Sequence, residues 1–312
     1  MLMKSRILHS FAAIALLGLA LQGCAKKDDA PQVDESRLFS SPEAAVDAFV
    51  SALEKQDTTE LVRILGQEGS ALLPSGDAIN DAQERDEFLA DYKAKHSLQS
   101  DGERKILVIG TNDWPFPIPV AKQGNKWFLD TLAGADELIF RRIGENELGA
   151  IAVSRGYVDA QKEYASLGRD GGEAGVYAMK ILSDEGRQNG LYWPTMEDEA
   201  PSPIGAFVAE AAAEGYRTES ATAYHGYRYR LLYRQGDKAA GGAKDYFVDG
   251  RLTGGFAMIA WPADYGNSGV KSFLINQDGT VFEKDLGETT EEAAAAIDSF
   301  NPDEGWKAVP AQ

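Results

Sequence analysis

The chain has 312 residues, of which 44% are apolar and 10% aromatic, so it is long enough for one large or two ordinary folded domains. Its formal net charge of −18 is repelled by phosphate backbones and anionic lipid headgroups, which argues against a nucleic-acid partner and against a basic membrane-binding face. A single cysteine excludes an intramolecular disulfide.

The first 24 residues have the pattern of an exported lipoprotein. A positively charged start precedes the apolar run 11–21, which is too short for a comfortable membrane span and is typical of a secretory signal peptide. Residues 21–24 (LQGC) resemble the lipobox of bacterial lipoproteins, which implies cleavage before Cys24 and acylation of its thiol and amino group. Because an Asp after the cysteine resembles an inner-membrane retention signal, Ala25 favours the periplasmic face of the outer membrane. Anchoring in the inner membrane and secretion are the alternatives.

We therefore predict a signal peptide over residues 1–23, and a lipidated Cys24 with a flexible tether over residues 24–39. Residues 25–37 (AKKDDAPQVDESR) contain almost no apolar side chains and cannot bury enough surface to fold. The predicted membrane partner is the bilayer, reached through acyl chains on Cys24, since two or more chains hold a protein firmly.

Residues 40–140 read as an N-terminal α+β domain. A cap-and-proline signal at Ser41-Pro42 starts a helix, and Asp57 caps a second helix that Gly66 ends. A third helix is predicted over about 77–96, followed by strands in the apolar runs 105–110, 118–121 and 126–129. The first two helices are similar to the start of cone-shaped domains of the NTF2-like and cystatin-like kind.

The segment 114–119 (WPFPIP) carries a proline at every second position. Proline removes backbone donors, so this segment must be an edge strand or an extended loop. Trp114 then belongs either to an aromatic surface for a partner or to a rigid crossing packed onto the core.

Residues 141–312 read as a C-terminal domain of one long helix and an antiparallel sheet. The helix 146–167 is apolar on two faces, so we expect it to lie between layers or between the two halves of the molecule. Arg141 and Arg142, just before it, either pair with carboxylates or bind an anion. The remaining predicted elements are a helix over 203–215, strands over 225–233, 255–261, 270–275 and 280–284, and a final helix over 290–300.

Catalytic groupings are absent from the sequence. After removal of the signal peptide two histidines remain, His96 and His225, and no Gly-x-Ser-x-Gly motif supplies a nucleophile. Zinc-ligand spacing, a phosphate-binding loop and a dinucleotide fingerprint are missing too. We predict no catalytic residue, no metal and no cofactor, and the candidate binding residues are Trp114, Arg141, Arg142, Trp193 and His225.

Several segments in order resemble one bacterial family. They are WPFPIP, RRIGENELGAI, YVDAQKEYA, GLYW, SPIGAF, YHGYRYRLL, GGFAMIAWPADYGNSGVKSF and GTVFEKDLG. Together they are similar to the family labelled domain of unknown function 2950 over residues 40–306, a label that implies no assigned activity, cofactor or partner. The part from Glu145 onward is also similar to pilin-like soluble domains, although the prepilin cleavage site and hydrophobic helix of that family are absent.

Three hypotheses about function follow. The leading one is a lipid-anchored, non-enzymatic binding or scaffold module that faces the periplasm and contacts an envelope protein. The second is binding of a small ligand in a cone-shaped cavity of residues 40–140. The third is a hydrolase that acts on envelope glycan or peptide through acidic residues.

Overall fold

The computed structural model describes residues 32–196, 198–206, 208, 211 and 223–310, and residues 34–312 form one compact unit. The signal peptide and Cys24 lie outside the described residues, as does much of the helix predicted over 203–215. The elements of the N-terminal half are η1 (Glu35–Arg37), α1 (Pro42–Lys55), α2 (Thr58–Ser70), α3 (Ala78–Ala94), β1 (His96–Asp101), β2 (Arg104–Ile109), β3 (Trp114–Pro115), β4 (Val120–Gln123) and β5 (Lys126–Leu129).

Side-chain caps start the three helices where the sequence predicts. Ser41 accepts the Ala44 N–H, and Asp57 and Asp77 cap α2 and α3 in the same way. Gly66 (φ 81°) interrupts the second helix, as the sequence predicts, but the chain is helical again to Ser70.

The break in α2 also explains why the predicted tether ends early. It leaves the carbonyls of Ile64 and Leu65 without helical partners, and the Arg37 guanidinium donates to both at 3.2 and 2.8 Å. Phe39 exchanges backbone hydrogen bonds with Trp127 on β5. The predicted flexible segment 24–39 is therefore wrong at its C-terminal end, where residues 34–39 are packed onto the N-terminal half.

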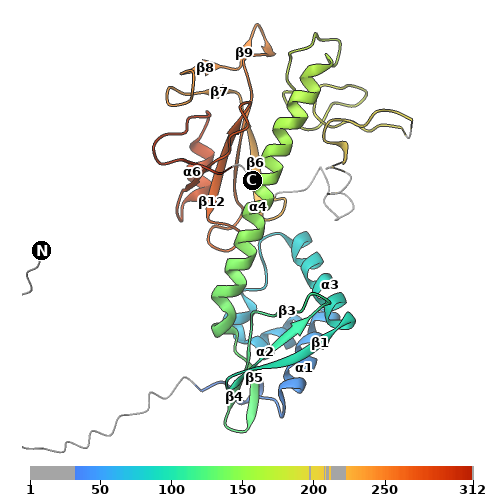
Figure 1. The fold of residues 1–312 in the computed structure, drawn as a ribbon, viewed down its shortest axis with the longest axis vertical. Coiled ribbons are helices and arrows are strands. Elements are labelled where there is room, and N and C mark those ends of the chain that lie inside the picture. Colours follow the sequence, from blue (N-terminus) through green and yellow to red (C-terminus); the bar gives the residue numbers. More distant parts are fainter. Residues whose placement is uncertain (1–31, 197, 207, 209–210, 212–222, 311–312) are drawn as a thin grey trace, which may run out of the picture. The chain divides into compact units, whose positions relative to one another are not determined.

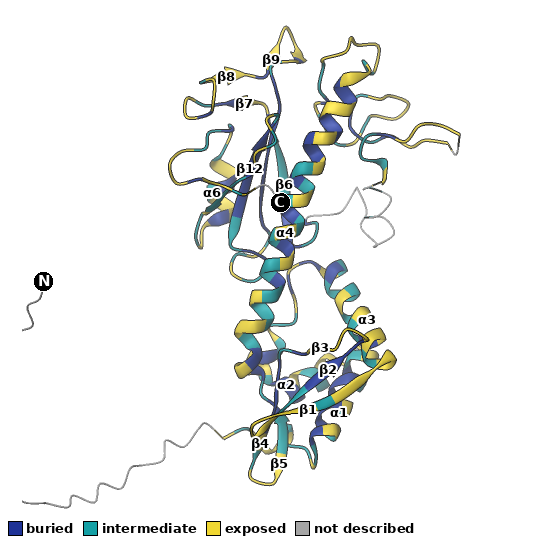
Figure 2. Ribbon diagram, in the orientation of Figure 1, coloured by how far each residue is buried: buried dark blue, intermediate teal, exposed yellow. Residues whose placement is uncertain are grey.

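The N-terminal sheet has the strand order β1-β2-β4-β5, with β3 paired to β2. Strand β1, which the sequence analysis missed, pairs along its whole length with β2 but is largely exposed (Figure 2). β3 makes only a short pairing with β2, as expected for a segment of alternating prolines.

Helix α4 (Thr131–Ser166) is much longer than predicted (Figure 1). The helix predicted from residue 146 begins at Thr131 instead, and Gly134 and Gly144 within the added part are both helical. Gly134 allows close packing, since a Cβ there would lie 2.6 Å from the carbonyl oxygen of Pro117. The predicted boundary between residues 140 and 141 falls inside this helix.

The C-terminal half is built on an antiparallel sheet with the order β14-β13-β12-β11-β6. Its elements are β6 (Tyr227–Leu232), β7 (Arg234–Gln235), β8 (Lys244–Asp245), β9 (Phe247–Val248), β10 (Arg251–Leu252), β11 (Ala257–Pro262), β12 (Lys271–Asn276), β13 (Phe282–Asp285), α6 (Thr290–Ala296) and β14 (Lys307–Ala308). All six residues of β11, predicted as a strand over 255–261, are buried, and β11 lies between β12 and β6. The hairpin of β12 and β13 is also confirmed.

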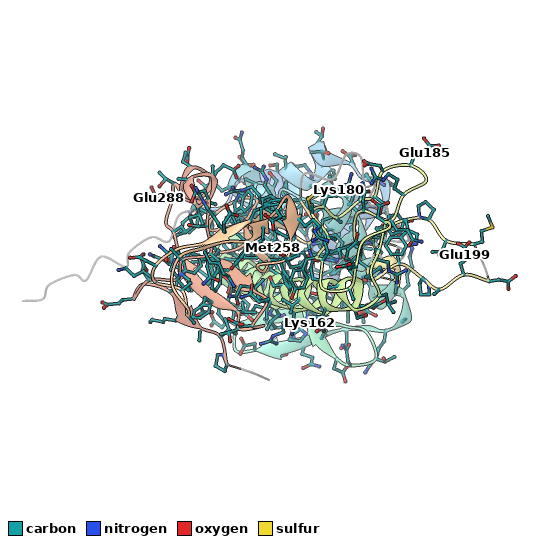
Figure 3. All side chains as sticks on the ribbon, turned by 90° about the horizontal axis from the view of Figure 1, so that it is seen from above. Lys162, Lys180, Glu185, Glu199, Met258 and Glu288 are labelled. Carbon is teal, nitrogen blue, oxygen red and sulfur yellow. The ribbon has the colours of Figure 1, made fainter. Side chains whose placement is uncertain are left out.

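Two hydrophobic cores result, one in each half, and α4 contacts elements of both halves. Figure 3 labels Met258 of β11 among closely packed side chains and Glu185, Glu199 and Glu288 at the periphery. Helices together with antiparallel sheets make the fold α+β, as predicted. None of the helices in the described residues combines the length and apolar character that crossing a bilayer requires.

Candidate functional site

A cleft of about 600 Å³ opens in the N-terminal half. Residues of α1, α2, α3 and α4 line it, together with residues of the segment 114–118 and of the connection that leads from α2 to α3. Its volume lies in the range of sites that hold a small organic ligand. Three of the five candidate binding residues from the sequence, Trp114, Arg141 and Arg142, line this cleft.

Aromatic rings form the apolar wall of the cleft. Phe49 of α1, Phe88 of α3 and Phe116 contact one another with ring centroids 5.2–5.8 Å apart, and Trp114 lies 6.2 Å from Phe116. Such pairs contribute about 0.5–1.5 kcal/mol each beyond the burial of their area. Phe49 and Phe116 are buried, whereas Phe88 and Trp114 are only half-buried, so the cluster keeps part of its surface open.

Helix α3 supplies an acidic wall. Asp81, Glu84, Phe88 and Asp91 recur at helical spacing, so the carboxylates share one face with the aromatic ring. Desolvation raises the pKa of Glu84, Arg142 opposes this shift, and the neighbouring charges of Glu145 and Asp81 add to it. The face combines apolar contact with negative charge.

Two arginines of α4 lie on the opposite wall. The Arg141 guanidinium lies 5.2 Å from the centroid of Trp114, and it donates to Glu137 at 2.7 Å and to the Pro115 carbonyl at 2.8 Å. Pairing of Arg141 with a carboxylate matches one of the two alternatives for this residue. Its contacts fix the position of Trp114 at the cleft.

Arg142 is only 6% exposed and holds several loops together. It donates to Asn267 Oδ1 at 2.6 Å and to the carbonyls of Leu72 and Leu73 at 2.8 and 3.0 Å. Its Nε is buried and makes no hydrogen bond among the described residues. Asn267 in turn donates to the Pro74 carbonyl at 3.0 Å, so Arg142 positions the α2–α3 connection at the edge of the cleft.

The other candidate residues lie away from the cleft. Trp193 is 6% exposed and belongs to the C-terminal core, with the Arg169 guanidinium 5.0 Å from its ring centroid. His225 occupies a turn before β6 with φ 47°, and its ring stands edge-on to Tyr224 at 4.3 Å. The structure therefore does not bring these two residues together with Trp114, Arg141 and Arg142.

The acidic and aromatic side chains of α3 were missed as site residues. Acidic residues on an exposed helix face usually only interact with solvent, so they gave no signal of a site. The available signal was Phe88, an aromatic residue at the same helical spacing as Glu84 and Asp91. In the part of the chain that the structure describes, no three His, Cys, Asp or Glu side chains are grouped to hold a metal ion.

Comparison with protein families places residues 36–309 within the model described as "Protein of unknown function (DUF2950)". No curated protein and no solved structure matches the chain. The likeness of the N-terminal half to NTF2-like and cystatin-like domains, and of the C-terminal half to pilin-like domains, stays a prediction.

Proposed function

The chain belongs to this family of proteins of unknown function, and from that premise we propose that it is a non-enzymatic module that binds a small ligand in the cleft of its N-terminal half. The observation that carries the proposal is an aromatic wall that stays partly open beside the cleft, with Phe88 and Trp114 half-buried. A concave site that combines apolar and aromatic surface with polar groups able to orient a ligand is typical of ligand sites.

The proposal places the module at the cell envelope. Cys24 is the only cysteine of the chain and ends the lipobox-like residues 21–24, which supports anchoring by acyl chains at the periplasmic face of the outer membrane. Mass spectrometry of the mature amino terminus is expected to find acylated Cys24. Cys24→Ser protein is expected to leave the membrane fraction, and its sedimentation with membranes in high salt would contradict the anchor.

Ligand binding is tested with Nile red, a neutral dye whose fluorescence rises in apolar surroundings. We expect the full chain to enhance its fluorescence, and Trp114→Ala to weaken binding by about three- to tenfold, since the ring supplies roughly 1 kcal/mol of contact. Trp127→Ala is the matched control. Trp127 is also half-buried and has a cation, the Lys122 ammonium group, over its ring, but it does not line the cleft.

Trp114→Ala could also weaken binding by loosening the packing around the cleft. A variant that fills the cleft instead avoids this ambiguity. Leu53 of α1 lines the cleft and is only partly buried, so Leu53→Trp places a larger ring in the open volume. Binding of Nile red is expected to disappear while the circular dichroism spectrum stays unchanged. Unaltered binding by both Leu53→Trp and Trp114→Ala would exclude the cleft as the site.

One observation favours a second candidate, a hydrolase of envelope glycan or peptide. Glu84 has a raised pKa and feels the charges of Glu145 and Asp81, which is an arrangement that a general acid and a general base can use. Turnover of peptidoglycan fragments by the full chain, lost in Glu84→Gln with Nile red binding retained, would establish this function in place of the first.

A further inference from the structure

We propose that the ligand of the cleft is a small organic cation, an ammonium group on an aromatic or apolar body. This inference rests on the proposed function and concerns the charge of the ligand. It follows from comparing the charged side chains of the lining with the partners that each of them already has.

Five carboxylates and three arginines line the cleft. They are Asp81, Glu84, Glu87, Asp91 and Glu145, and Arg85, Arg141 and Arg142. Two of the arginines are neutralised by acids that do not line the cleft, since Arg85 pairs with Asp86 at 2.9 Å and Arg141 pairs with Glu137 at 2.7 Å. Arg142 is the lining cation without a carboxylate partner in the described chain, and its two Nη atoms donate to backbone carbonyls and Asn267.

None of the lining carboxylates has a positively charged side chain as a hydrogen-bond or ion-pair partner within the described residues. Asp81 accepts the Ser75 N–H at 2.9 Å and Glu84 accepts the Asn80 amide at 2.8 Å, and both donors are neutral. The side chains of Glu87, Asp91 and Glu145 make no hydrogen bond or ion pair within the described residues. The unused polar capacity of the lining is therefore mainly that of acceptors with negative charge.

Three of these acceptors share a helix face with an aromatic ring of the cleft. Asp81, Glu84 and Asp91 share a face of α3 with Phe88, whose ring contacts Phe49 and Phe116. An ammonium ion is attracted both to a carboxylate and to the face of an aromatic ring, whereas an anion is repelled by both. A flat apolar body can at the same time cover the open surface of Phe88 and Trp114.

The pKa of Glu84 agrees with this geometry. Desolvation and the neighbouring carboxylates raise the pKa of Glu84, which means that its ionised form is energetically unfavourable in the empty cleft. A bound cation would lower the pKa of Glu84 and offset that cost. Binding should accordingly strengthen as the pH rises through the raised pKa of Glu84.

The experiment compares three probes of similar shape and different charge on the full chain by titration calorimetry. Tryptamine carries an ammonium group, 3-ethylindole is neutral and indole-3-acetate is an anion. We expect tryptamine to bind about tenfold more tightly than 3-ethylindole, which corresponds to about 1.4 kcal/mol, and indole-3-acetate to bind most weakly. The preference for tryptamine should shrink in 0.5 M salt, because the carboxylates are accessible to solvent ions.

Substitutions locate the charge. Glu87→Gln and Asp91→Asn are expected to weaken tryptamine binding by about three- to tenfold and to leave 3-ethylindole unaffected. Glu103→Gln is the control, since Glu103 is an exposed glutamate of the same half that does not line the cleft. If 3-ethylindole and tryptamine bind equally well and Trp114→Ala weakens the binding of both, the ligand is not selected for positive charge. The proposal that the cleft binds a ligand would then still stand.

A different result would show that the cleft binds no ligand at all. If neither Nile red nor any of the three probes binds, the ligand site itself is excluded. Acetyl-tryptophanyl-lysine amide serves as a further arm that distinguishes a free amine from a lysine side chain in a polypeptide. Tighter binding of this peptide than of tryptamine would overturn the assignment to a small free amine.

Discussion

Around β11 the rings of Phe256 and Phe273 are fully enclosed, whereas around the cleft part of the aromatic cluster stays open. Phe256 and Phe273 are 0% and 1% exposed, and Tyr157 and Tyr177 meet Phe256 edge-on at 5.5 and 4.7 Å. In the N-terminal half, the ring cluster reaches from the buried Phe49 and Phe116 to the half-buried Phe88 and Trp114. Aromatic content alone therefore does not distinguish a hydrophobic core from a binding site. The solvent-exposed fraction of each aromatic ring does.

The largest expected effect tests the enclosed core. Phe256→Ala is expected to lower the free energy of unfolding by about 3–5 kcal/mol, because Phe256 is fully buried and its removal leaves a cavity beside Tyr157 and Tyr177. Phe88→Ala removes the same atoms from a half-buried position and should cost only about 1–2 kcal/mol, while it weakens Nile red binding. Urea unfolding followed by circular dichroism measures both values. Equal losses would remove the distinction between the two cores.

The next effect concerns the residue that joins the two regions. Arg142→Met leaves the carbonyls of Leu72 and Leu73 without their donor and should cost roughly 2–4 kcal/mol. Arg142→Lys should recover little, since a lysine cannot reproduce the planar arrangement of donors. Arg141→Met is the control and should cost less than about 1 kcal/mol, because its ion pair with Glu137 is exposed. Similar losses in Arg141→Met and Arg142→Met would contradict the structural role of Arg142.

Two glycines of α4 give a smaller pair of effects with opposite sign. A Cβ at Gly134 would lie 2.6 Å from the Pro117 carbonyl oxygen, so Gly134→Ala should destabilise by about 1–3 kcal/mol. At Gly149 a Cβ meets no atom within 4 Å, so Gly149→Ala should stabilise by roughly 0.5–1 kcal/mol through helix propensity. Thermal unfolding of the two variants distinguishes close packing from open helix surface, and a gain at Gly134 would show that the N-terminal half is looser than described.

The smallest expected effect is a pH dependence in the open region. The raised pKa of Glu84 means that its ionised form is disfavoured in the folded protein relative to the unfolded chain. Glu84→Gln should therefore raise the melting temperature at neutral pH. The gain should disappear as the pH falls through the raised pKa of Glu84 to the ordinary pKa of a glutamate, where Glu84 is protonated in both states. If the increase in melting temperature does not depend on pH, it arises from a change in packing and not from the ionisation of Glu84.

Local signals in the sequence predicted the elements whose causes are local. The caps at Ser41 and Asp57 and the fully apolar run of β11 need no information from distant residues. Strand β1 was missed because its side chains are mostly exposed and show no apolar alternation, so only its pairing with β2 defines it. The early start of α4 has no local signal of this kind, because glycine disfavours a helix and the place of Gly134 in it is explained by close packing against Pro117.

The site was predicted in part for the same reason. Trp114, Arg141 and Arg142 stood out as unusual residues in an acidic, proline-marked context, and all three line the cleft. Trp193 also stood out, but only the packing of the C-terminal half shows that it is core. The α3 carboxylates look like any solvated face until the rings of Phe49 and Phe116 are placed against Phe88.

The contacts of Arg37 and Phe39 have a mechanical consequence. Tension on the chain before residue 34 reaches the described fold at the contacts of residues 36–39. These include the Arg63 hydrogen bond to the Ser36 carbonyl, the Arg37 hydrogen bonds to Ile64 and Leu65, and the backbone pairing of Phe39 with Trp127. These few bonds would bear the load first, so a pull from that end should peel residues 34–39 away from α2 and β5 before it strains any buried strand. The protein therefore carries, beside its first helix, a short segment that can yield and re-form under force.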